Sequence, residues 1–209
     1  MQAYFGVCTF VLSKKDFEGR VENDMDGRGG NSMFPELETA RLRLRELTEE
    51  DVPAIFRCFS NEALTRYYGQ EPFTDTQQAE QLIKQFAKNF EEKRGIRWGI
   101  ERKDSNEVIG TVGFHLWSAA HQRAEIGYEI HPDYWRQGYT KEAVQKVIAY
   151  GFRDMNLNRI GAVVFLENEA SSKLLIQLGF QQEGILRDYM YQKGQAHDTF
   201  IYSLLKKDE

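Results

Sequence analysis

The hydrophobic positions of the chain switch several times between two spacings. Leucines and arginines alternate from Arg41 to Leu47, which predicts a half-buried strand. Apolar residues three or four positions apart follow from Val52 to Phe59, which predicts a helix begun by Thr48 and Asp51. The same patterns predict strands over 97–102, 107–116, 123–130, 159–165, 180–186 and 197–205, and helices over about 76–93, 140–154 and 169–178.

This order of elements indicates one domain of the α/β (α+β) class. It predicts a mixed, mostly antiparallel twisted sheet of about seven strands with helices on both faces. The first 32 residues differ from the rest, because Asn23–Ser32 has the composition of a flexible linker and clear strand alternation begins only after Met33. We therefore expect an N-terminal extension of unknown role over 1–32 and a single domain over 33–209.

The segment from Glu125 to Ala143, EIGYEIHPDYWRQGYTKEA, carries the strongest indication of chemistry. A strand ends at Pro132, a short turn contains Gly138, and an amphipathic helix follows. The start of a helix leaves backbone N–H groups unpaired and carries a partial positive charge from the macrodipole. A phosphate or pyrophosphate fits such a site, and Gly138 allows its close approach to the backbone.

Side chains around this turn reinforce the prediction of an anion site. Arg136 and Lys141 add positive charge, and the Thr140 hydroxyl can either bind a phosphate or cap the helix. A turn that merely precedes a helix has a similar sequence, so the flanking segments decide between the two interpretations.

Composition limits the class of protein. The 209 residues suffice for a substantial core, and 41% hydrophobic residues with a mean hydropathy of -0.58 argue against a membrane protein. The longest apolar run, Ala3–Leu12, is about half of a membrane span and lacks the flanks of a signal peptide, so we expect a cytoplasmic protein. A net charge of -5 without a basic stripe argues against a nucleic-acid partner.

Cysteine and histidine positions give no metal or redox motif. Cys8 and Cys58 are interpreted as ordinary buried thiols. The four histidines are scattered without the spacing of metal ligands, so no metal is predicted.

Three separated motifs resemble the GNAT superfamily of N-acetyltransferases. The string from Trp135 through Gly138 to Thr140 is similar to the family's pyrophosphate loop, although Trp135 replaces Arg or Gln and Thr140 replaces Gly or Ala. The preceding strand, AEIGYEI, resembles the strand that binds the pantetheine arm, and NEASSKLLIQLGF, from Asn168, resembles the second motif on the coenzyme A side. The segments EGILRD and ETARLRLREL are typical of the RimJ/RimL-like branch, which acetylates N-terminal amino groups of ribosomal proteins.

The resemblance implies acetyl-CoA as cosubstrate and a single GNAT domain, with a homodimer as a possible assembly. It implies that Asn168 contacts the pantetheine or a bridging water, although a plain helix cap explains this residue equally well. The implied cofactor-binding residues lie on the strand, in the loop and at the second motif: Tyr128, Ile130, Arg136, Gln137, Gly138, Tyr139, Thr140, Lys141 and Asn168.

Acetyl transfer to an amine requires a neutral nucleophile. At pH 7 deprotonation costs about 4–5 kcal/mol for a lysine side chain and about 1–1.5 kcal/mol for an α-amino group, so water-relayed removal of the proton by a carboxylate suffices for the latter. Glu125 is the first candidate base, at a position where family members place a catalytic glutamate, and Glu129 is the second. Backbone N–H groups near Tyr128 and Glu129 are candidates to stabilise the oxyanion.

The departing thiolate needs a proton donor. Many family members use a tyrosine in the helix after the asparagine, but Leu175 occupies that position here. Ser171 is the hydroxyl in the same helix, as in the Rim branch, and is the candidate acid. The predicted function is acetyl transfer to a primary amine, most simply a protein N-terminus. A polyamine or an aminoglycoside as acceptor, and a non-catalytic acyl-CoA-binding module, are the alternatives.

Overall fold

The computed structural model describes residues 33–208, so the predicted extension and Cys8 lie outside the described part. The helices and 3-10 turns of this part are η1 (Glu49–Asp51), α1 (Val52–Phe59), α2 (Glu62–Thr65), α3 (Thr76–Glu91), η2 (Pro132–Tyr134), α4 (Tyr139–Arg153), α5 (Glu169–Gln177) and η3 (Lys206–Asp208). The strands are β1 (Leu37–Glu38), β2 (Leu42–Arg45), β3 (Ile96–Arg102), β4 (Val108–Ser118), β5 (Arg123–Ile130), β6 (Arg159–Phe165), β7 (Gln181–Gln192) and β8 (Gln195–Leu205).

The strands form one mixed sheet in the order β1-β2-β3-β4-β5-β6-β8-β7. All neighbours pair antiparallel except β5 and β6, which pair in parallel. The fold class predicted from the sequence is confirmed. The sheet has eight strands within residues 33–208, because the two-residue β1 joins the seven that hydrophobic alternation revealed.

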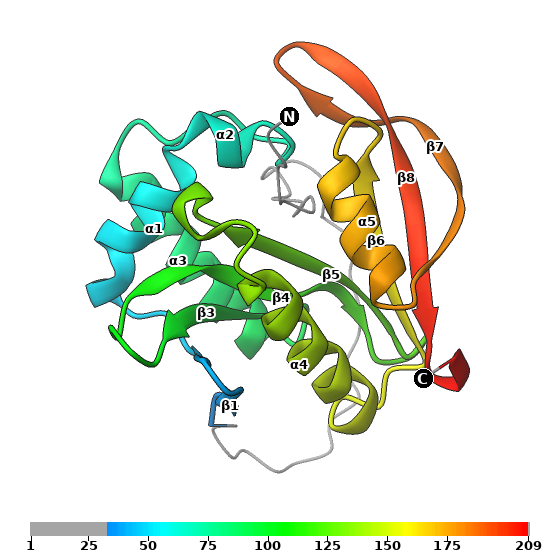
Figure 1. The fold of residues 1–209 in the computed structure, drawn as a ribbon, viewed down its shortest axis with the longest axis horizontal. Helices are drawn as coiled ribbons and strands as arrows, with labels where there is room; N and C mark the ends of the chain where they lie inside the picture. Colours follow the sequence, from blue (N-terminus) through cyan, green and yellow to red (C-terminus); the bar gives the residue numbers. More distant parts are fainter. Residues whose placement is uncertain (1–32, 209) are drawn as a thin grey trace.

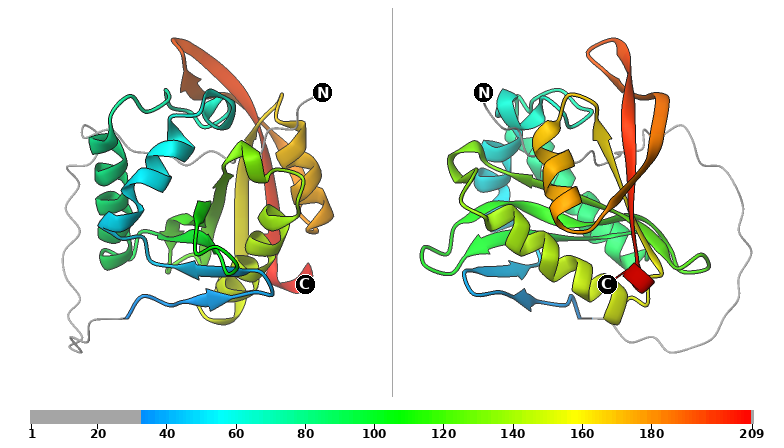
Figure 2. Two further views of the ribbon diagram at one scale, coloured as in Figure 1. Left: turned by 60° about the vertical axis from the view of Figure 1, so that its left-hand side comes forward. Right: turned by 45° about the vertical axis from the view of Figure 1, so that its right-hand side comes forward.

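Helices cover both faces of the sheet, as Figures 1 and 2 show. On one face, Val144 and Phe152 of α4 and Leu174 of α5 pack against the even-numbered side chains of β5, among them Tyr128. On the other face α1 and α3 pack together through Ile55, Phe59, Ile83 and Phe86. Each helix therefore buries the apolar side that its sequence spacing predicts.

Local sequence explains where the helices begin. Asp75 and Gln78 form a capping box at the start of α3, and Asn168 caps α5 through its side-chain oxygen. Thr48 and Asp51 also form the predicted capping box, but it begins the short turn η1 rather than α1 itself. These caps satisfy N–H groups that precede the intrahelical ladder.

Two features depart from the sequence prediction. The segment between α1 and α3, where the sequence predicted neither helix nor strand, contains the four-residue helix α2, which Asn61 caps. The last two strands are longer than predicted and form a hairpin that projects beyond the helices in Figure 1. Gln192 ties this hairpin to the end of α2 and the segment that follows it, by donating to the carbonyl oxygens of Thr65 and Gln70, each at 3.0 Å. Within residues 33–208, no helix is long and apolar enough to cross a membrane.

Candidate functional site

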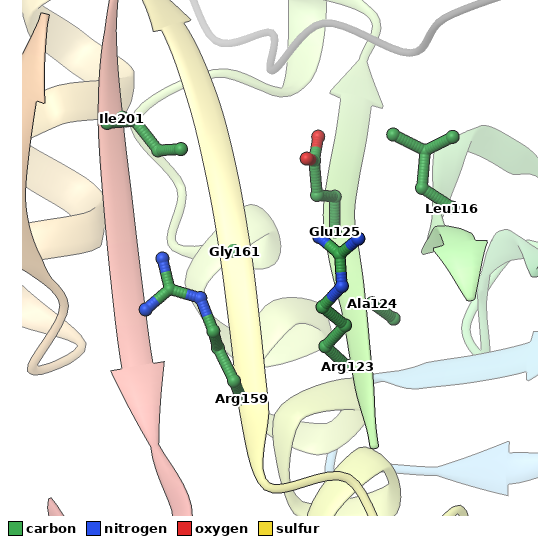
Figure 3. A pocket seen from close by; sticks show the side chains of 7 residues that line it. All are labelled: Leu116, Arg123, Ala124, Glu125, Arg159, Gly161 and Ile201. Carbon is green, nitrogen blue, oxygen red and sulfur yellow. The ribbon is translucent and has the colours of Figure 1, made fainter. Parts of the chain in front are cut away.

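Strands β5 and β6 are joined over a short length only. Their paired residues run from Arg123 with Arg159 to Glu125 with Gly161, and the described residues show no further pairing between these strands. Figure 3 shows the two strands diverging beyond these positions. The backbone of Ile126–Ile130 therefore has one side that faces away from any β6 partner. An extended chain can hydrogen-bond to such an edge.

The turn predicted to bind phosphate lies at the carboxyl end of β5. Gly138 is the N-cap of α4 and has a φ of +82°, in the left-handed region that favours glycine. The first bond of the α4 ladder runs from Glu142 N to Gly138 O (3.1 Å). The N–H groups of Tyr139, Thr140 and Lys141 precede this ladder and have no acceptor within the helix among the residues described. This geometry fits the predicted anion site.

A distant segment clamps this turn. The backbone N–H of Arg41 donates to Glu142 Oε1 (2.9 Å), and its Nε donates to Glu142 Oε2 (2.7 Å). Its Nη1 donates to the carbonyl oxygen of Gln137 (2.9 Å), while the Thr39 hydroxyl donates to Glu142 Oε1 (2.5 Å). The clamp is not visible in the sequence, because nothing in the local pattern connects Arg41 with a helix that begins about 100 residues later.

Hydrogen bonding at the clamp changes the acidity of Glu142. Partial burial raises the pKa of the Glu142 carboxyl, but the bonds from Thr39 and from the Arg41 backbone and side chain outweigh it and lower the pKa below 4.5. Glu142 is therefore ionised at neutral pH, and the Arg41 guanidinium stays beside the turn.

Some of the other predicted binding residues in the turn before α4 are exposed, and others are buried. Arg136, Gln137 and Lys141 are exposed, whereas Tyr139 and Thr140 are buried. The Tyr139 ring lies under the Arg41 guanidinium, 4.3 Å from Cζ to the ring centroid. Arg136, Gln137 and Lys141 can thus reach a ligand with their side chains, while Tyr139 and Thr140 contribute backbone N–H groups.

Glu125 and Glu129 lie on the same face of β5 in different surroundings. Glu125 is half-buried, and its Oε2 lies 3.4 Å from Nε2 of His115, its direct partner across β4. It also lines a small pocket of about 50 Å³, large enough for water (Figure 3). The pocket is lined by Leu116, Arg123, Ala124, Glu125, Arg159, Gly161 and Ile201.

Glu129 is fully buried and bonded to neighbouring strands. Arg97 of β3 forms an ion pair with its Oε2. The Thr111 hydroxyl of β4 donates to the same oxygen at 2.7 Å and accepts from Arg97 Nε at 3.0 Å. A carboxylate held by two donors in the interior is a poor candidate for moving a proton to and from solvent.

Asn168, Ser171 and Tyr128 meet on the opposite face of the sheet. Asn168 is buried, and its Oδ1 accepts from the backbone N–H of Ser171 at 3.2 Å, so it does cap α5. Ser171 is also fully buried. Burial raises the pKa of the Tyr128 hydroxyl, and the neighbouring Ser171 hydroxyl lowers it in part, so Tyr128 is protonated at neutral pH. The predicted acid therefore lies beside the strand predicted to bind the pantetheine.

The structure separates the predicted site residues into three groups. The turn residues lie at the end of β5, Ser171 and Asn168 lie beside Tyr128, and Glu125 lies on the other face near the origin of the β5–β6 divergence. Ile130 is buried in the core, where its carbonyl oxygen accepts from Trp135 Nε1 at 2.6 Å. Among residues 33–208, no group of three or more His, Cys, Asp and Glu side chains is arranged to hold a metal ion.

Comparisons with known proteins agree with this architecture. A family model described as an acetyltransferase (GNAT) domain matches residues 41–181. YoaA of Bacillus subtilis (strain 168), an uncharacterized N-acetyltransferase, is 56% identical over 177 residues, which cover 85% of this chain and 100% of YoaA. The chain therefore belongs to the GNAT acetyltransferase family, and it is an acyltransferase of the N-acetyltransferase type.

Two solved structures share the fold. The ribosomal alpha-N-protein acetyltransferase RimL in complex with coenzyme A superposes with a TM-score of 0.74 at 21% identity, covering 82% of this chain and 97% of RimL. The spermidine N-acetyltransferase of Vibrio cholerae, in complex with coenzyme A and spermine, gives a TM-score of 0.72 at 24% identity, covering 81% of this chain and 98% of that chain.

Proposed function

We propose that this protein transfers an acetyl group from acetyl-CoA directly to a primary amine, and that the amine is a protein N-terminal amino group. The observation that carries the proposal is the left-handed turn at Gly138, which follows the part of β5 that pairs with no β6 residue among residues 33–208. The turn provides anion-binding N–H groups, and the strand provides backbone groups for an extended arm.

The residues at the turn fit the pyrophosphate of acetyl-CoA. The N–H groups of Tyr139, Thr140 and Lys141 point out of the first turn of α4, and the positive end of the helix dipole lies there. Arg41 adds a guanidinium held in place by Glu142. Arg136 and Lys141 contribute further positive charge, and Gln137 contributes an amide. Two solved structures with this fold hold coenzyme A, which supports the assignment.

Glu125 is the residue we assign as the base. It differs from Glu129 in having no Arg or Lys ion-pair partner within residues 33–208 and in facing a pocket with room for water. Water in that pocket relays the proton from the amine to the carboxylate, and the neutral amine attacks the thioester carbonyl. Backbone N–H groups near Tyr128 and Glu129, in the part of β5 that has diverged from β6, are assigned to stabilise the oxyanion.

Ser171 is the residue we assign as the acid. Its hydroxyl lies beside the protonated Tyr128 hydroxyl and gives its proton to the departing thiolate. The proton that the amine releases balances this transfer, and solvent returns a proton to Ser171 once coenzyme A has left. Asn168 supports this role indirectly, because its cap of α5 holds the backbone of Ser171 in place. Leu175, at the position of the usual tyrosine, is fully buried and carries no proton donor.

The acceptor class follows from proton chemistry. An α-amino group requires only about 1–1.5 kcal/mol for deprotonation at pH 7, which a half-buried carboxylate acting through water can supply. A polyamine is the second candidate, because the Vibrio cholerae relative in fold binds spermine. The same Glu125 serves either acceptor.

An acetylation screen tests the proposal. The protein is incubated with acetyl-CoA and either a panel of N-terminal peptides of ribosomal proteins or a panel of polyamines and aminoglycosides, and products are identified by mass spectrometry. Acetylated peptide α-amines support the proposal. If only polyamines are acetylated, the acceptor is a polyamine and not a protein N-terminus. If calorimetry detects coenzyme A binding but no amine is acetylated, the protein is a binding module.

A further inference from the structure

His115 and Glu125 are cross-strand neighbours that face each other on β4 and β5. Their register pairing places the His115 Nε2 3.4 Å from Glu125 Oε2. The exposed fractions of the two side chains are 13% and 19%, so both are shielded from most of the solvent. The other imidazole nitrogen, Nδ1, is buried and has no hydrogen-bond partner within residues 33–208.

These contacts restrict where the proton on His115 can lie. A carboxylate oxygen and an unprotonated nitrogen are both acceptors, so their approach is favourable only with a proton on Nε2. A proton on Nδ1 would leave a buried donor without an acceptor, which costs more than leaving a buried nitrogen lone pair in the neutral ring. The neutral Nε2–H tautomer satisfies both conditions.

We propose that His115 is a positioning residue that holds Glu125 ready to accept the proton of the amine. In this arrangement Nε2–H donates to Oε2 and fixes the carboxylate, while Oε1 is left to accept a proton from water in the pocket. The proposal rests on the function assigned to Glu125 above. It adds a residue and a proton position that the pattern of the sequence does not indicate.

The charged groups around this pair are mostly engaged with one another. On the same face of the sheet, Arg97 pairs with Glu129, and Arg159 pairs with Glu183. Arg123, two residues before Glu125, is exposed. The helix α3 turns Ile83 and Phe86 toward the sheet, and its charged residues are exposed: Glu80, Lys84, Lys88 and Glu91. Within residues 33–208, His115 is thus the titratable side chain at ion-pair distance from Glu125, while Arg123 and Arg159 line the pocket beside it.

The pair makes a specific prediction about catalysis. A donated hydrogen bond holds the carboxylate in one orientation, so loss of the donor lets Glu125 turn away from the amine. In H115F, kcat should fall about tenfold while the Kd for coenzyme A stays at the wild-type value. In H115Q, whose amide N–H can replace Nε2–H, most of the activity should return. A purely structural role of His115 would weaken coenzyme A binding together with kcat, and H115Q would restore neither.

A double-mutant cycle tests whether His115 acts through Glu125. In an E125Q background, H115F should cause little further loss, because the carboxylate that His115 positions is already gone. An undiminished loss in that background, or a wild-type kcat in H115F, overturns the proposal. The exposed His121, in the turn after β4, provides the control, and H121F should behave as wild type. Circular dichroism and coenzyme A affinity establish that each variant is folded.

Nitrogen-15 NMR provides a readout that does not depend on turnover. His115, assigned by comparison with H115Q, should show the Nε2–H tautomer in the wild-type protein and should lose that preference in E125Q. If His115 is the Nδ1–H tautomer, or if E125Q does not change its tautomer, the proposal is overturned, even if no amine substrate has been found. A failed acetylation screen with the Nε2–H tautomer present would refute the assigned function and leave the pair intact.

Discussion

Arg41 and Glu142 form a two-pronged contact across 101 positions of sequence. The Arg41 backbone N–H binds one carboxylate oxygen, and its guanidinium Nε and Nη2 bind the other at 2.7 Å each. A third guanidinium nitrogen binds Gln137 O, so Arg41 connects the start of β2 to both the turn and the first turn of α4. The shape of the predicted pyrophosphate site thus depends on a residue outside the motif.

Removal of Arg41 should weaken coenzyme A binding more than it destabilises the fold. The guanidinium is about half exposed, so R41A should cost about 1 kcal/mol or less in the free energy of unfolding. It should raise the Kd for coenzyme A about tenfold, because the turn loses its clamp and a positive charge. The control is R43A, since Arg43 lies on the same strand but pairs with Glu101. Equal affinities of the two variants in calorimetry would contradict the clamp.

The left-handed turn at Gly138 can be tested with a matched glycine. G138A should cost about 1–2 kcal/mol of stability, because alanine is strained at a φ of +82°, and it should also weaken coenzyme A binding. G194A introduces the same strain at a φ of +74° in the β7–β8 hairpin, where an added Cβ meets nothing within 4 Å. It should lower stability alone. Thermal melts and calorimetry distinguish the two, and unchanged affinity in G138A would refute the binding role of the turn.

The two glutamates of β5 should respond in opposite ways to the same substitution. E125Q should lower kcat about 100-fold or more while retaining coenzyme A binding and stability, because it removes the assigned base alone. E129Q should destabilise the fold by about 3–5 kcal/mol, since it leaves Arg97 buried without its counter-charge. Urea unfolding and steady-state kinetics measure the two effects. If E129Q is stable but loses its activity while E125Q remains active, Glu129 is the base and Glu125 is not.

The assigned acid has a neighbouring control of the same residue type. S171A should lower kcat about tenfold, with little change in the KM for acetyl-CoA, if the Ser171 hydroxyl protonates the thiolate. S172A removes the next hydroxyl along α5 and should leave kcat unchanged, because no partner for the Ser172 hydroxyl exists within residues 33–208. Identical kinetics of S171A and wild type would show that another group protonates the thiolate.

The clamp should also confer a measurable dependence of stability on pH. The pKa of Glu142 lies below 4.5 in the folded protein, so the unfolded chain takes up its proton first as the pH falls. The contribution of the clamp is complete above pH 4.5 and is lost as the pH falls through the lower folded value. Glu183, whose pKa Arg159 and Ser203 lower to about 2, acts in the same direction.

The comparison of wild type with E142Q isolates the Glu142 contribution, because Glu183 is present in both. The difference in Tm between them should be largest above pH 4.5 and should narrow below it. A difference that is constant down to pH 3 would show that Glu142 does not titrate with the clamp.

Much of the candidate site was predictable from local sequence. Alternation located β5, Pro132 marked its end, and Gly138 marked the turn before α4, where the structure places it. Cys58 was predicted to be an ordinary buried thiol, and it is buried, with burial raising its pKa to about 12. These features depend on neighbouring residues along the chain, so their physical causes are visible in the sequence.

The differences between equivalent residues were not predictable. Glu125 and Glu129 share a strand and a face, and the sequence alone ranks them only by resemblance. The structure separates them, because the register of β3, β4 and β5 brings Arg97 and Thr111 to Glu129 but His115 to Glu125. The two-residue alternation along a strand indicates the face on which a side chain lies, but it contains no information about the residue opposite it on the neighbouring strand.

The sequence by itself determined the elements, the α/β class and the turn suited to a phosphate, since periodicity, proline, glycine and capping residues act over a few positions. Tertiary structure decided the clamp from Arg41, the burial of Glu129 and the contact of His115 with Glu125. Each of these joins residues from separate strands or helices, and strand register and helix packing, which depend on the whole fold, fix which side chains meet.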